Sequence, residues 1–425
     1  MAEMTSQEQL MLELINRARM DPAGEAKRFG IKLNEGVSKQ DKISDGPKQV
    51  LAGNDDLQDA ADDHSDWMLD HKFSHYEGKK DPGDRMQDAG YNFTGNWTWG
   101  ENIAARGGMS ATDAIIRHHK DLFVDKGVEH RGHRLNILNA AFQEIGIGQE
   151  MGGGTSMVTQ DFARSGSSAF VTGVVYDDND NDNFFSVGDQ TVGIAVSAPG
   201  TPNDTTGSGG GYELRFAAGA GATMVTFDLA TDVVVGVDVG GRNIKLDVVN
   251  GDEVWSDSSI TSTSTNVTEL HALGVGKINF DGASHGQEMY GNKAANRLEG
   301  NGGDDTLVGG RGKDELHGDT GADIFIFAKG DTGKTAAKAD TIADFSLGDS
   351  DVINLTAWDA NSKQNGDQAF TFIDDQAFHK VAGELRAVDN GVDTFVRGDT
   401  DGDGKADFVI RLNGIVALTG GDFAL

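Results

Sequence analysis

The sequence predicts a multidomain chain: an N-terminal α+β domain, a central all-β sandwich and a C-terminal parallel β-roll. Three observations support this. Apolar residues recur at helical spacing within the first 125 residues, they alternate with a period of two from residue 169, and a nine-residue repeat begins at residue 282. We place the domain boundaries at 1–166, 167–281, 282–326 and 327–425.

The composition excludes several classes of protein. The chain has 425 residues, no cysteine and a formal net charge of −32. Without cysteine it is not a disulfide-stapled mini-protein, and a surface this acidic repels nucleic acid. We expect no membrane span, because no apolar run is long enough, and no N-terminal secretion signal, because the first residues lack its basic and apolar segments. Most of the negative charge lies in residues 151–425.

The first domain has the pattern of helices packed on a sheet. Ser6 and Gln9 form a capping-box pattern before apolar residues at helical spacing, and Asp21-Pro22 ends that helix. His64 and His71 share the apolar face of the next helix, so we expect both in the core. We expect this second helix at about 56–72, a third at about 111–124, and strands at about 145–148 and 157–162.

The second segment reads as short strands. Phe170, Thr172, Val174 and Tyr176 alternate with residues of the opposite face. Loops of Ser, Thr and Gly separate later strand-like runs, and this spacing predicts an antiparallel sandwich. The expected runs are 191–198, 212–217, 223–229, 233–239, 243–249 and 267–280.

The nine-residue repeats predict calcium sites. The stretch 309–317 fits G-G-x-G-x-D-x-U-x at every fixed position, and this repeat resembles that of the RTX calcium-binding proteins. Two repeats form one circuit, so we expect Asp305 with Asp323, and Asn296 with Asp314, to share two Ca²⁺ ions. The alternative is a flexible linker rich in Gly and Asp. The turn glycines expected at these sites are Gly300, Gly302, Gly309, Gly312 and Gly318.

Two further acidic loops have the ligand spacing of an EF-hand or a close variant of it. In the first loop Asn183 stands where an EF-hand has glycine, and asparagine tolerates the left-handed conformation needed there. Each loop either binds Ca²⁺ or is an acidic turn without metal. The candidate ligands are Asp178, Asp180, Asp182, Phe184 (through its carbonyl) and Asp189 in the first loop, and Asp399, Asp401, Asp403 and Asp407 in the second.

Residues 327–425 resemble the C-terminal region of secreted serralysin-type metalloproteases, over stretches that include 340–345, 351–355 and 398–408. The resemblance implies export by a type I secretion machinery through an uncleaved C-terminal signal, and therefore an extracellular protein. It does not imply protease activity, because the zincin motif H-E-x-x-H is absent.

The motifs of the first domain follow an order typical of one superfamily. They are Phe73-Ser-His75, Trp99-Gly-Glu-Asn-Ile-Ala104, Gly132-His-Arg-Leu-Asn-Ile-Leu138 and Val158-Thr-Gln-Asp-Phe162. In this order they resemble a bacterial CAP (SCP-like) domain, the superfamily of cysteine-rich secretory proteins, antigen 5 and pathogenesis-related 1. The resemblance implies an α-β-α sandwich with a cleft lined by His and Glu.

On that resemblance His75, Glu101 and His133 line the cleft. Two histidines and a carboxylate suit a divalent cation such as Zn²⁺, acid–base catalysis, or merely the ordering of two loops. The sequence leaves these three possibilities open. Our leading interpretation is a secreted, modular calcium-binding protein whose CAP domain binds an extracellular ligand. The alternatives are a metal-assisted hydrolase that uses this cleft, and an adhesin or matrix protein.

Overall fold

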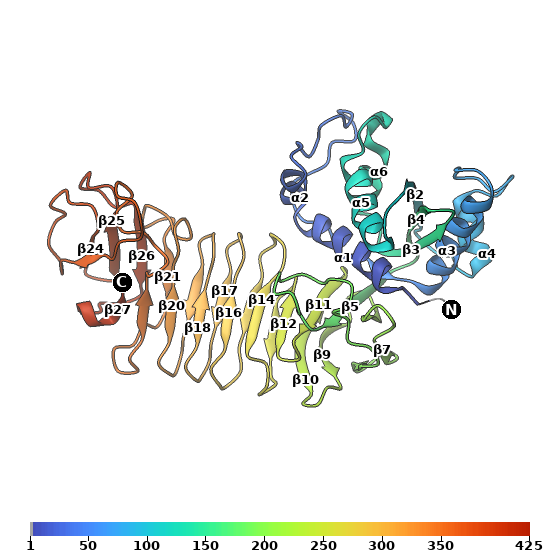
Figure 1. The fold of residues 1–425 in the computed structure, drawn as a ribbon. Coiled ribbons are helices and arrows are strands. Elements are labelled where there is room, and N and C mark those ends of the chain that lie inside the picture. The colour runs from blue at the N-terminus through green and yellow to red at the C-terminus, as the bar shows by residue number, and fades with distance from the viewer. Residues whose placement is uncertain (1–2) are drawn as a thin grey trace. The chain divides into compact units, whose positions relative to one another are not determined.

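The computed structural model describes residues 3–425, and the chain divides into two compact units (Figure 1). The first unit runs to Val233 and includes Val237–Gly251, and the second contains Val234–Gly236 and Asp252–Leu425. Among the described residues, no helix is both long and apolar enough to cross a membrane.

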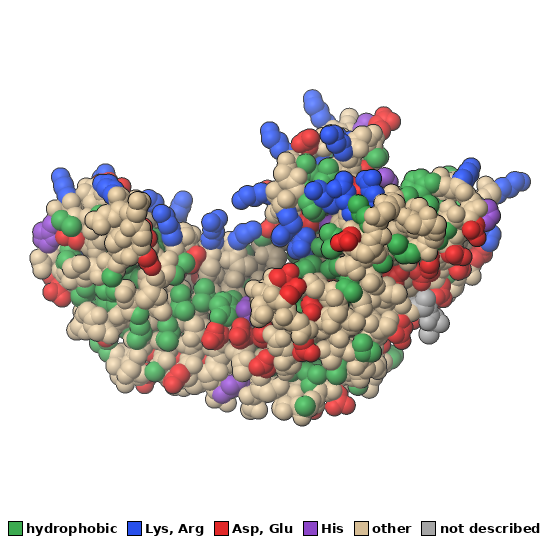
Figure 2. All heavy atoms as spheres, in the orientation of Figure 1, with side chains coloured by type: hydrophobic (Ala, Val, Ile, Leu, Met, Phe, Trp, Pro, Cys, Tyr) green, Lys and Arg blue, Asp and Glu red, His purple; other side chains and the backbone are tan. Residues whose placement is uncertain are grey.

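The N-terminal part of the first unit is a four-stranded sheet covered by helices, which confirms the predicted α+β class. The strand order is β1-β3-β4-β2, with β1 parallel to β3 and the other pairs antiparallel. In Figure 2 its basic side chains gather around α2 and α5 and its acidic side chains around α3, so the charge of this part is uneven. The elements are α1 Ser6–Met20, α2 Pro22–Arg28, β1 Ala52–Gly53, α3 Asp55–Asp70, α4 Pro82–Ala89, β2 Thr98–Gly107, α5 Ala111–Val124, the 3₁₀ turn η1 Glu129–Arg131, α6 Gly132–Ile137, β3 Glu144–Gly152 and β4 Thr155–Arg164.

The cap of α1 lies one residue before the predicted one. Thr5 accepts the N–H of Glu8, and the Glu8 carboxylate accepts the N–H of Thr5 at 2.8 Å, so the capping box is Thr5 with Glu8 rather than Ser6 with Gln9. Asp21 does end α1 as predicted, and it also caps α2 by accepting the N–H of Gly24 at 2.9 Å.

Two glycines allow α3 to lie directly on the sheet. A Cβ atom at Gly146 would lie 2.1 Å from the backbone of Leu57, and one at Gly148 would lie 2.3 Å from the backbone of Ala61. No side chain fits into such a gap. The predicted run of Ile145, Gly146, Ile147 and Gly148 therefore buries its isoleucines on one face and admits the helix backbone on the other.

Short strands complete the first unit. Strand β5 pairs antiparallel with β8 but parallel with β11, and β6 pairs antiparallel with β7 and β9. The prediction of a purely antiparallel sandwich was therefore wrong at β5 and β11. The strands of this segment are β5 Ser168–Tyr176, β6 Ala195–Ser197, β7 Asp204–Thr205, β8 Gly211–Ala217, β9 Gly221–Phe227, β10 Val233–Val239 (whose middle residues Val234–Gly236 group with the second unit) and β11 Ile244–Val249.

A buried ion cluster joins α1 to these strands. The Lys245 ammonium on β11 lies 2.6 Å from Glu13 on α1 and 2.8 Å from Asp247, and all three side chains are almost fully buried. Burial opposes the charge on Lys245, but the two carboxylates raise its pKa above the ordinary value. Because a buried charge is tolerated only with such partners, the cluster fixes α1 against β11.

The second unit is a β-roll built from two stacks of parallel strands, visible as the ladder from β12 to β22 in Figure 1. Equivalent residues of successive rungs are 18 positions apart in the repeat region, as in the pairing of Leu298 with Leu316 and of Met289 with Leu307. The eighth position of each repeat, the apolar U of the pattern, is fully buried, so these side chains form the interior of the roll. The buried central residues are Leu270, Phe280, Met289, Leu298, Leu307, Leu316, Phe325, Ile342 and Ile353.

The roll begins earlier than its repeats. Strands β12 and β14 are parallel, with Leu270 opposite Val254, and β14 continues into β16 with Leu270 opposite Met289. Residues 267–280 are therefore rungs of the roll, and their predicted place in an antiparallel sandwich was wrong. Residues 253–272 contain no glycine, and the rung at 273–281 has Gly274 and Gly276 but Ile278 in place of the sixth-position Asp. Short strands alone do not distinguish the two folds.

At the far end of the roll the pairing changes. Strand β26 is parallel to β21 but antiparallel to β25, and β25 is antiparallel to β24. The elements of this unit are β12 Glu253–Ser256, β13 Ile260–Ser262, β14 Glu269–Ala272, β15 Asn279–Asp281, β16 Glu288–Tyr290, β17 Arg297–Glu299, β18 Thr306–Val308, β19 Glu315–His317, β20 Ile324–Ile326, β21 Asp340–Ile342, β22 Val352–Asn354, β23 Thr371–Phe372, β24 Glu384–Asp389, β25 Thr394–Asp399, β26 Phe408–Leu412, the turn η2 Gly420–Asp422 and β27 Phe423–Ala424.

We predict that Gly148→Ala lowers the free energy of unfolding of the full chain by about 3 kcal/mol, because the new methyl group forces α3 away from β3. Chemical denaturation followed by tryptophan fluorescence measures the change. The matched control is Gly46→Ala, where a Cβ atom meets no atom within 4 Å. Equal stability of the two variants would contradict the close contact.

Candidate functional sites

The sixth-position carboxylates of the repeats form a ladder inside the roll. One oxygen of each, Oδ1, accepts the backbone N–H of the sixth-position residue in an earlier rung. Asp323 accepts from Asp305 at 2.9 Å, and Asp314 accepts from Asn296 at 2.8 Å. Both predicted pairs, Asp305 with Asp323 and Asn296 with Asp314, therefore come together on neighbouring rungs. The remaining contacts of this kind join Asp305 to Gln287, Asp340 to Asp314 and Asp351 to Asp323.

The second oxygen of four of these carboxylates has no partner. The Oδ2 atoms of Asp305, Asp314, Asp323 and Asp340 are buried and accept no hydrogen bond. Burial raises the pKa of Asp305 and Asp314 to about 7, that of Asp323 to about 6 and that of Asp340 to about 8. A buried carboxylate oxygen without a donor is unfavourable, and a hard cation with oxygen ligands satisfies it. These residues therefore fit Ca²⁺.

The first glycine of each repeat faces the unpaired oxygen. A Cβ atom at Gly300, Gly309 or Gly318 would lie 2.1–2.7 Å from Oδ2 of the Asp in its own repeat. Glycine is therefore required to leave the oxygen open. Gly312 has a φ of +149° and faces Oδ1 of Asp314, whereas Gly302 lies nearest to Thr320, away from these carboxylates.

Amides replace the carboxylates in the two earliest repeats. Asn296 accepts the N–H of Asn292 at 3.0 Å and donates its own N–H to the carbonyl of Ile278 at 2.7 Å. Gln287 does the same with Ala283 at 2.6 Å and Val267 at 2.7 Å. In each case an amide N–H supplies the positive partner that a carboxylate lacks. The structure therefore gives no support to Asn296 as a calcium ligand.

Sequence reasoning missed two members of the ladder. Asp340 and Asp351 continue it, although they lie 26 and 28 residues after the residues that donate to them. Both begin segments that were noticed only for their resemblance to secreted proteases. The loop at 327–339 interrupts the nine-residue register, but the pattern of Asp followed two residues later by buried Ile342 or Ile353 is the signal that identifies them.

The first acidic loop closes around three of its predicted ligands. Oxygen atoms of Asp178, Asp180 and Asp189 lie within 4.8 Å of one another. Asn183 has a φ of +60°, as expected. Asp182 is not part of this group, and its carboxylate accepts the N–H of Phe184 at 2.8 Å. A role for the Phe184 carbonyl stays a prediction.

The second acidic loop behaves in the same way. Asp399, Asp401 and Asp407 bring ligand atoms within 4.8 Å of one another, whereas Asp403 accepts the N–H of Lys405 at 2.8 Å. The Lys334 ammonium lies 2.9 Å from Asp407, so a cationic side chain already contacts one member of the group.

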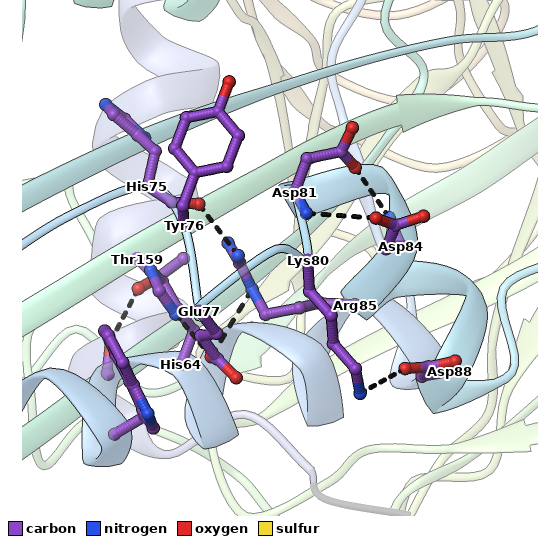
Figure 3. A network of polar contacts seen from close by, with 12 residues as sticks. His64, His75, Tyr76, Glu77, Lys80, Asp81, Asp84, Arg85, Asp88 and Thr159 are labelled. Carbon is purple, nitrogen blue, oxygen red and sulfur yellow. Dashed lines mark hydrogen bonds and ion pairs between the residues drawn. The ribbon is translucent and has the colours of Figure 1, made fainter.

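The residues predicted to line a cleft in the first unit include a connected set of charged side chains. Glu101 on β2 pairs with His75 Nδ1 at 2.6 Å, and its other oxygen accepts a hydrogen bond from Arg85 on α4. Arg85 also donates to the carbonyl of His75 at 2.9 Å and lies 3.7 Å from Glu77 (Figure 3). The predicted neighbours His75 and Glu101 therefore lie together, and sequence reasoning missed Glu77 and Arg85.

His64 and His71 have different environments. His64 is buried as expected, but it is also part of the cleft network, because its ring lies 2.7 Å from Glu77 and 3.0 Å from the carbonyl of Ser74. The expectation for His71 was wrong: α3 ends at Asp70, so His71 is exposed and stacks on Trp67.

A second carboxyl group lies beneath Glu101. Asp161 is directly opposite Glu101 on the neighbouring strand β4, is fully buried, and has no hydrogen-bond partner at either carboxyl oxygen. Burial, and then the negative charge of Glu101, raise the pKa of Asp161 well above its ordinary range. Two carboxyl groups therefore lie side by side in the interior, and the charged form of Asp161 is disfavoured there. Asp161 stood within the Thr159-Gln160-Asp161-Phe162 motif, but only the strand register shows its partner.

The third predicted cleft residue is held elsewhere. The His133 ring pairs with Asp125 at 2.8 Å, and Asp125 also accepts the N–H of His133 at 2.9 Å. In the part of the chain that the structure describes, His75, Glu101 and His133 do not form a group with ligand atoms within 4.8 Å. The link between the motifs is instead made by amides, since Asn102 donates to the His133 carbonyl at 3.2 Å and to Gln160 at 3.0 Å.

Comparisons with known proteins identify one family in the N-terminal part of the chain and a second in the repeat region. The model of the CAP family, described as the cysteine-rich secretory protein family, matches residues 12–162. The model of the RTX calcium-binding nonapeptide repeat, in four copies, matches residues 290–325. No curated protein gives a significant match.

Three solved structures resemble parts of the chain. An extracellular protein with an SCP domain from Bacillus anthracis is 23% identical over 39% of this chain and 45% of that chain, with a TM-score of 0.22. The R3 subunit of the Azotobacter vinelandii mannuronan C5-epimerase AlgE6 is 21% identical over 42% and 81%, with a TM-score of 0.23. NaASP2, crystallised with Zn²⁺, is 18% identical over 38% and 80%, with a TM-score of 0.26. The chain spans less than half of the Bacillus protein.

In the absence of calcium, we predict that the second unit becomes less stable as the pH rises from about 5 to about 8. The folded-state pKa values of the ladder, about 6 to about 8, lie above the ordinary value, so the protonated carboxyls stabilise the fold at low pH. This stability is lost as the pH rises through those values.

Thermal unfolding of the full chain in chelator, followed by far-UV circular dichroism across this range, tests the prediction. The unfolding midpoint should fall with pH, and calcium should restore it most at the alkaline end. The double variant Asp314→Asn and Asp323→Asn is the control, since it removes two of the titrating groups. A midpoint that rises with pH through the neutral range would contradict the assignment.

Proposed function

We propose that this protein, which carries a CAP domain at residues 12–162 and RTX calcium-binding repeats at 290–325, is a secreted modular protein whose roll folds on binding calcium outside the cell and whose CAP cleft binds an extracellular ligand. The observation that carries the proposal is the row of buried Oδ2 atoms without partners in Asp305, Asp314, Asp323 and Asp340.

Calcium then acts as a folding signal. At the low free calcium of the cytosol the carboxylates of the ladder repel one another and oppose folding. Outside the cell, calcium near about 10⁻³ M fills sites with dissociation constants of roughly 10⁻⁴–10⁻³ M, and the binding free energy becomes folding free energy. Because the chain has no cysteine, calcium takes the place that disulfides hold in many extracellular proteins.

Export by a type I machinery is part of this proposal. It is supported by the RTX repeats and by the resemblance of residues 327–425 to secreted serralysin-type proteins, whose export signal is C-terminal. A chain that remains unfolded at cytosolic calcium concentrations is suited to passage through such a channel. The machinery that reads the C-terminus and the extracellular ligand of the cleft are the two partners that we propose.

The cleft favours recognition over metal binding. Glu101 has one oxygen paired with His75 and the other with Arg85, so both oxygens are already engaged by basic groups. A divalent cation such as Zn²⁺ would have to displace them, and His133 is paired with Asp125 instead. A polar ligand that accepts from Arg85 or His75 is the simpler occupant.

A hydrolase is the second candidate function, because one observation favours it. Glu101 and Asp161 are two carboxyl groups buried on neighbouring strands next to His75 and His64, and such a pair is suited to acid–base chemistry. In this case Glu101 is the base that His75 orients, and Asp161 is a positioning residue beside it.

We predict that exchange of Asp and Asn in the ladder changes the calcium count in both directions. Asp314→Asn removes an unpaired carboxylate and should bind fewer calcium ions, whereas Asn296→Asp creates one and should bind at least one more. Asn296→Asp should also lower the stability of the calcium-free chain, because the donor to the Ile278 carbonyl is lost. Equilibrium dialysis with metal analysis counts the ions, and circular dichroism follows folding. An unchanged count in both variants would refute the ladder as the calcium site.

We predict that Glu101→Gln abolishes any hydrolysis of a peptide, ester or glycan panel, by about a hundredfold or more, if the cleft is catalytic. Asp161→Asn should shift the pH profile of the reaction, which a purely structural residue would not do. His133→Ala is the matched control and should keep most of the activity, since its ring pairs with Asp125. Turnover that survives Glu101→Gln would show that the cleft is not the catalytic site. If the wild type hydrolyses no member of the panel, ligand binding is left as the function.

A further inference from the structure

The outer face of the roll carries a cluster of ionisable side chains in the rungs that precede the repeats. Glu253 on β12 is directly opposite Glu269 on β14, and His271 follows Glu269 two positions later on the same face (Figure 1). Val254 and Leu270, which alternate with them, are fully buried inside the roll. One ligand atom of each of the three ionisable residues lies within 4.8 Å of the other two.

The distances in this cluster suit one metal ion bound by a nitrogen and two oxygens. His271 Nε2 lies 2.8 Å from Glu269 Oε2 and 4.0 Å from Glu253 Oε2. A tetrahedral Zn²⁺ ion with bonds of about 2.0–2.2 Å separates its ligand atoms by roughly 3.4 Å. Small rotations of the two carboxylates therefore bring all three atoms within bonding distance of one ion. The side chains are 16% to 34% exposed, so a water molecule can complete the coordination.

The imidazole of His271 is held between two aromatic rings. Trp255 on β12 stacks on it with ring centres 4.3 Å apart, and Tyr290 on β16 stacks on it with ring centres 4.5 Å apart. The stack covers both faces of the imidazole and leaves its edge, which carries Nε2, directed at the carboxylates. Trp255 also donates its indole N–H to Glu253 at 3.0 Å. Contacts of this kind orient the ligands of a metal site.

Negative charge is aligned along the same face. Glu253, Glu269 and Glu288 are opposite one another on three successive strands, and neighbouring strands lie about 4.8 Å apart. Like charges placed opposite each other in a sheet are unfavourable. Tyr290 donates a hydrogen bond to Glu288, and His271 contacts the other two carboxylates. A divalent cation beside His271 offsets the charge of both.

The tripeptide Glu-Leu-His of this cluster occurs a second time on the roll without forming such a group. His317 on β19 contacts Glu315 at 3.0 Å, and its side chain is 19% exposed, like that of His271. The carboxylate of the neighbouring rung, Glu299, is paired with Arg297. Among residues 3–425, no group of three ligand atoms within 4.8 Å forms at this second tripeptide. The three-ligand arrangement is therefore not a by-product of the local sequence.

We propose that Glu253, Glu269 and His271 bind a transition-metal ion of the Zn²⁺ class, at a site separate from the calcium ladder. Calcium takes oxygen ligands, whereas imidazole is a preferred ligand of Zn²⁺, Cu²⁺ and Ni²⁺. The ion joins β12 to β14 near the start of the roll, in rungs that have no sixth-position Asp. It therefore links two rungs that the calcium ions of the repeats do not reach.

Calorimetric titration of the full chain with Zn²⁺, in buffer that contains calcium at about 10⁻³ M, tests the proposal. We expect a saturable site whose affinity is weaker by about tenfold or more in Glu253→Gln and in His271→Ala. Glu253→Gln keeps an oxygen that accepts from Trp255, so we expect it to fold like the wild type, and thermal unfolding checks this. His317→Ala is the matched control, because it alters the same tripeptide where the third ligand is missing.

Cu²⁺ gives a second readout, because an ion bound at this site lies beside Trp255 and quenches its fluorescence. The quenching should be smaller in Trp255→Phe and in His271→Ala than in the wild type and in His317→Ala. Equal Zn²⁺ affinity of the wild type, Glu253→Gln and His271→Ala would overturn the proposal. The absence of saturable Zn²⁺ binding to the wild type, or an equal loss of affinity in His317→Ala, would do the same.

Discussion

The need to neutralise carboxylates stacked inside the roll governs the C-terminal half of this protein. Each sixth-position Asp accepts a hydrogen bond at one oxygen from a backbone N–H of an earlier rung, and this contact sets the register between rungs. In Asp305, Asp314, Asp323 and Asp340 the other oxygen is then buried without a donor. The same geometry that aligns the strands therefore creates the demand for a cation in these rungs. The hydrophobic column of Leu298, Leu316 and their equivalents adds stability and does not require a cation.

The repeat region could be predicted almost completely from the sequence, because its signal is local. A turn glycine, an Asp and an apolar residue recur at fixed positions, and the structure buries that apolar residue as expected. The prediction failed where the local signal ends. Residues 253–281 continue the roll by parallel backbone pairing without a sixth-position Asp, and Asp340 follows a loop that breaks the period. Backbone pairing imposes little demand on side chains, so it leaves little trace in the sequence.

In the first unit, prediction of the site depended on a known tertiary arrangement and not on a local repeat. His75 and Glu101 were predicted as neighbours because the resemblance to the CAP superfamily supplies a tertiary arrangement. Asp161 stood in one of the quoted motifs, but its role follows from the register of β2 with β4, and that of Arg85 follows from α4 packing beside β2. The buried Lys245, Glu13 and Asp247 cluster is a stronger example, since residues more than 200 positions apart meet in it. Interactions of this kind depend on the three-dimensional placement of distant residues, and no local sequence pattern predicts them.

The amides of Gln287 and Asn296 make the two ends of the repeat region different. Their rungs are hydrogen-bonded without a cation, and Asn296 presents its backbone N–H to Asp314. In a linear array where each unit contacts only its neighbours, a boundary that is already ordered removes the nucleation barrier for the next unit. Within the calcium-dependent folding that we propose, the amide rungs are the ordered starting point, and calcium binding extends the order in one direction, toward Asp351. An array of this kind responds to calcium more sharply than isolated sites of the same affinity.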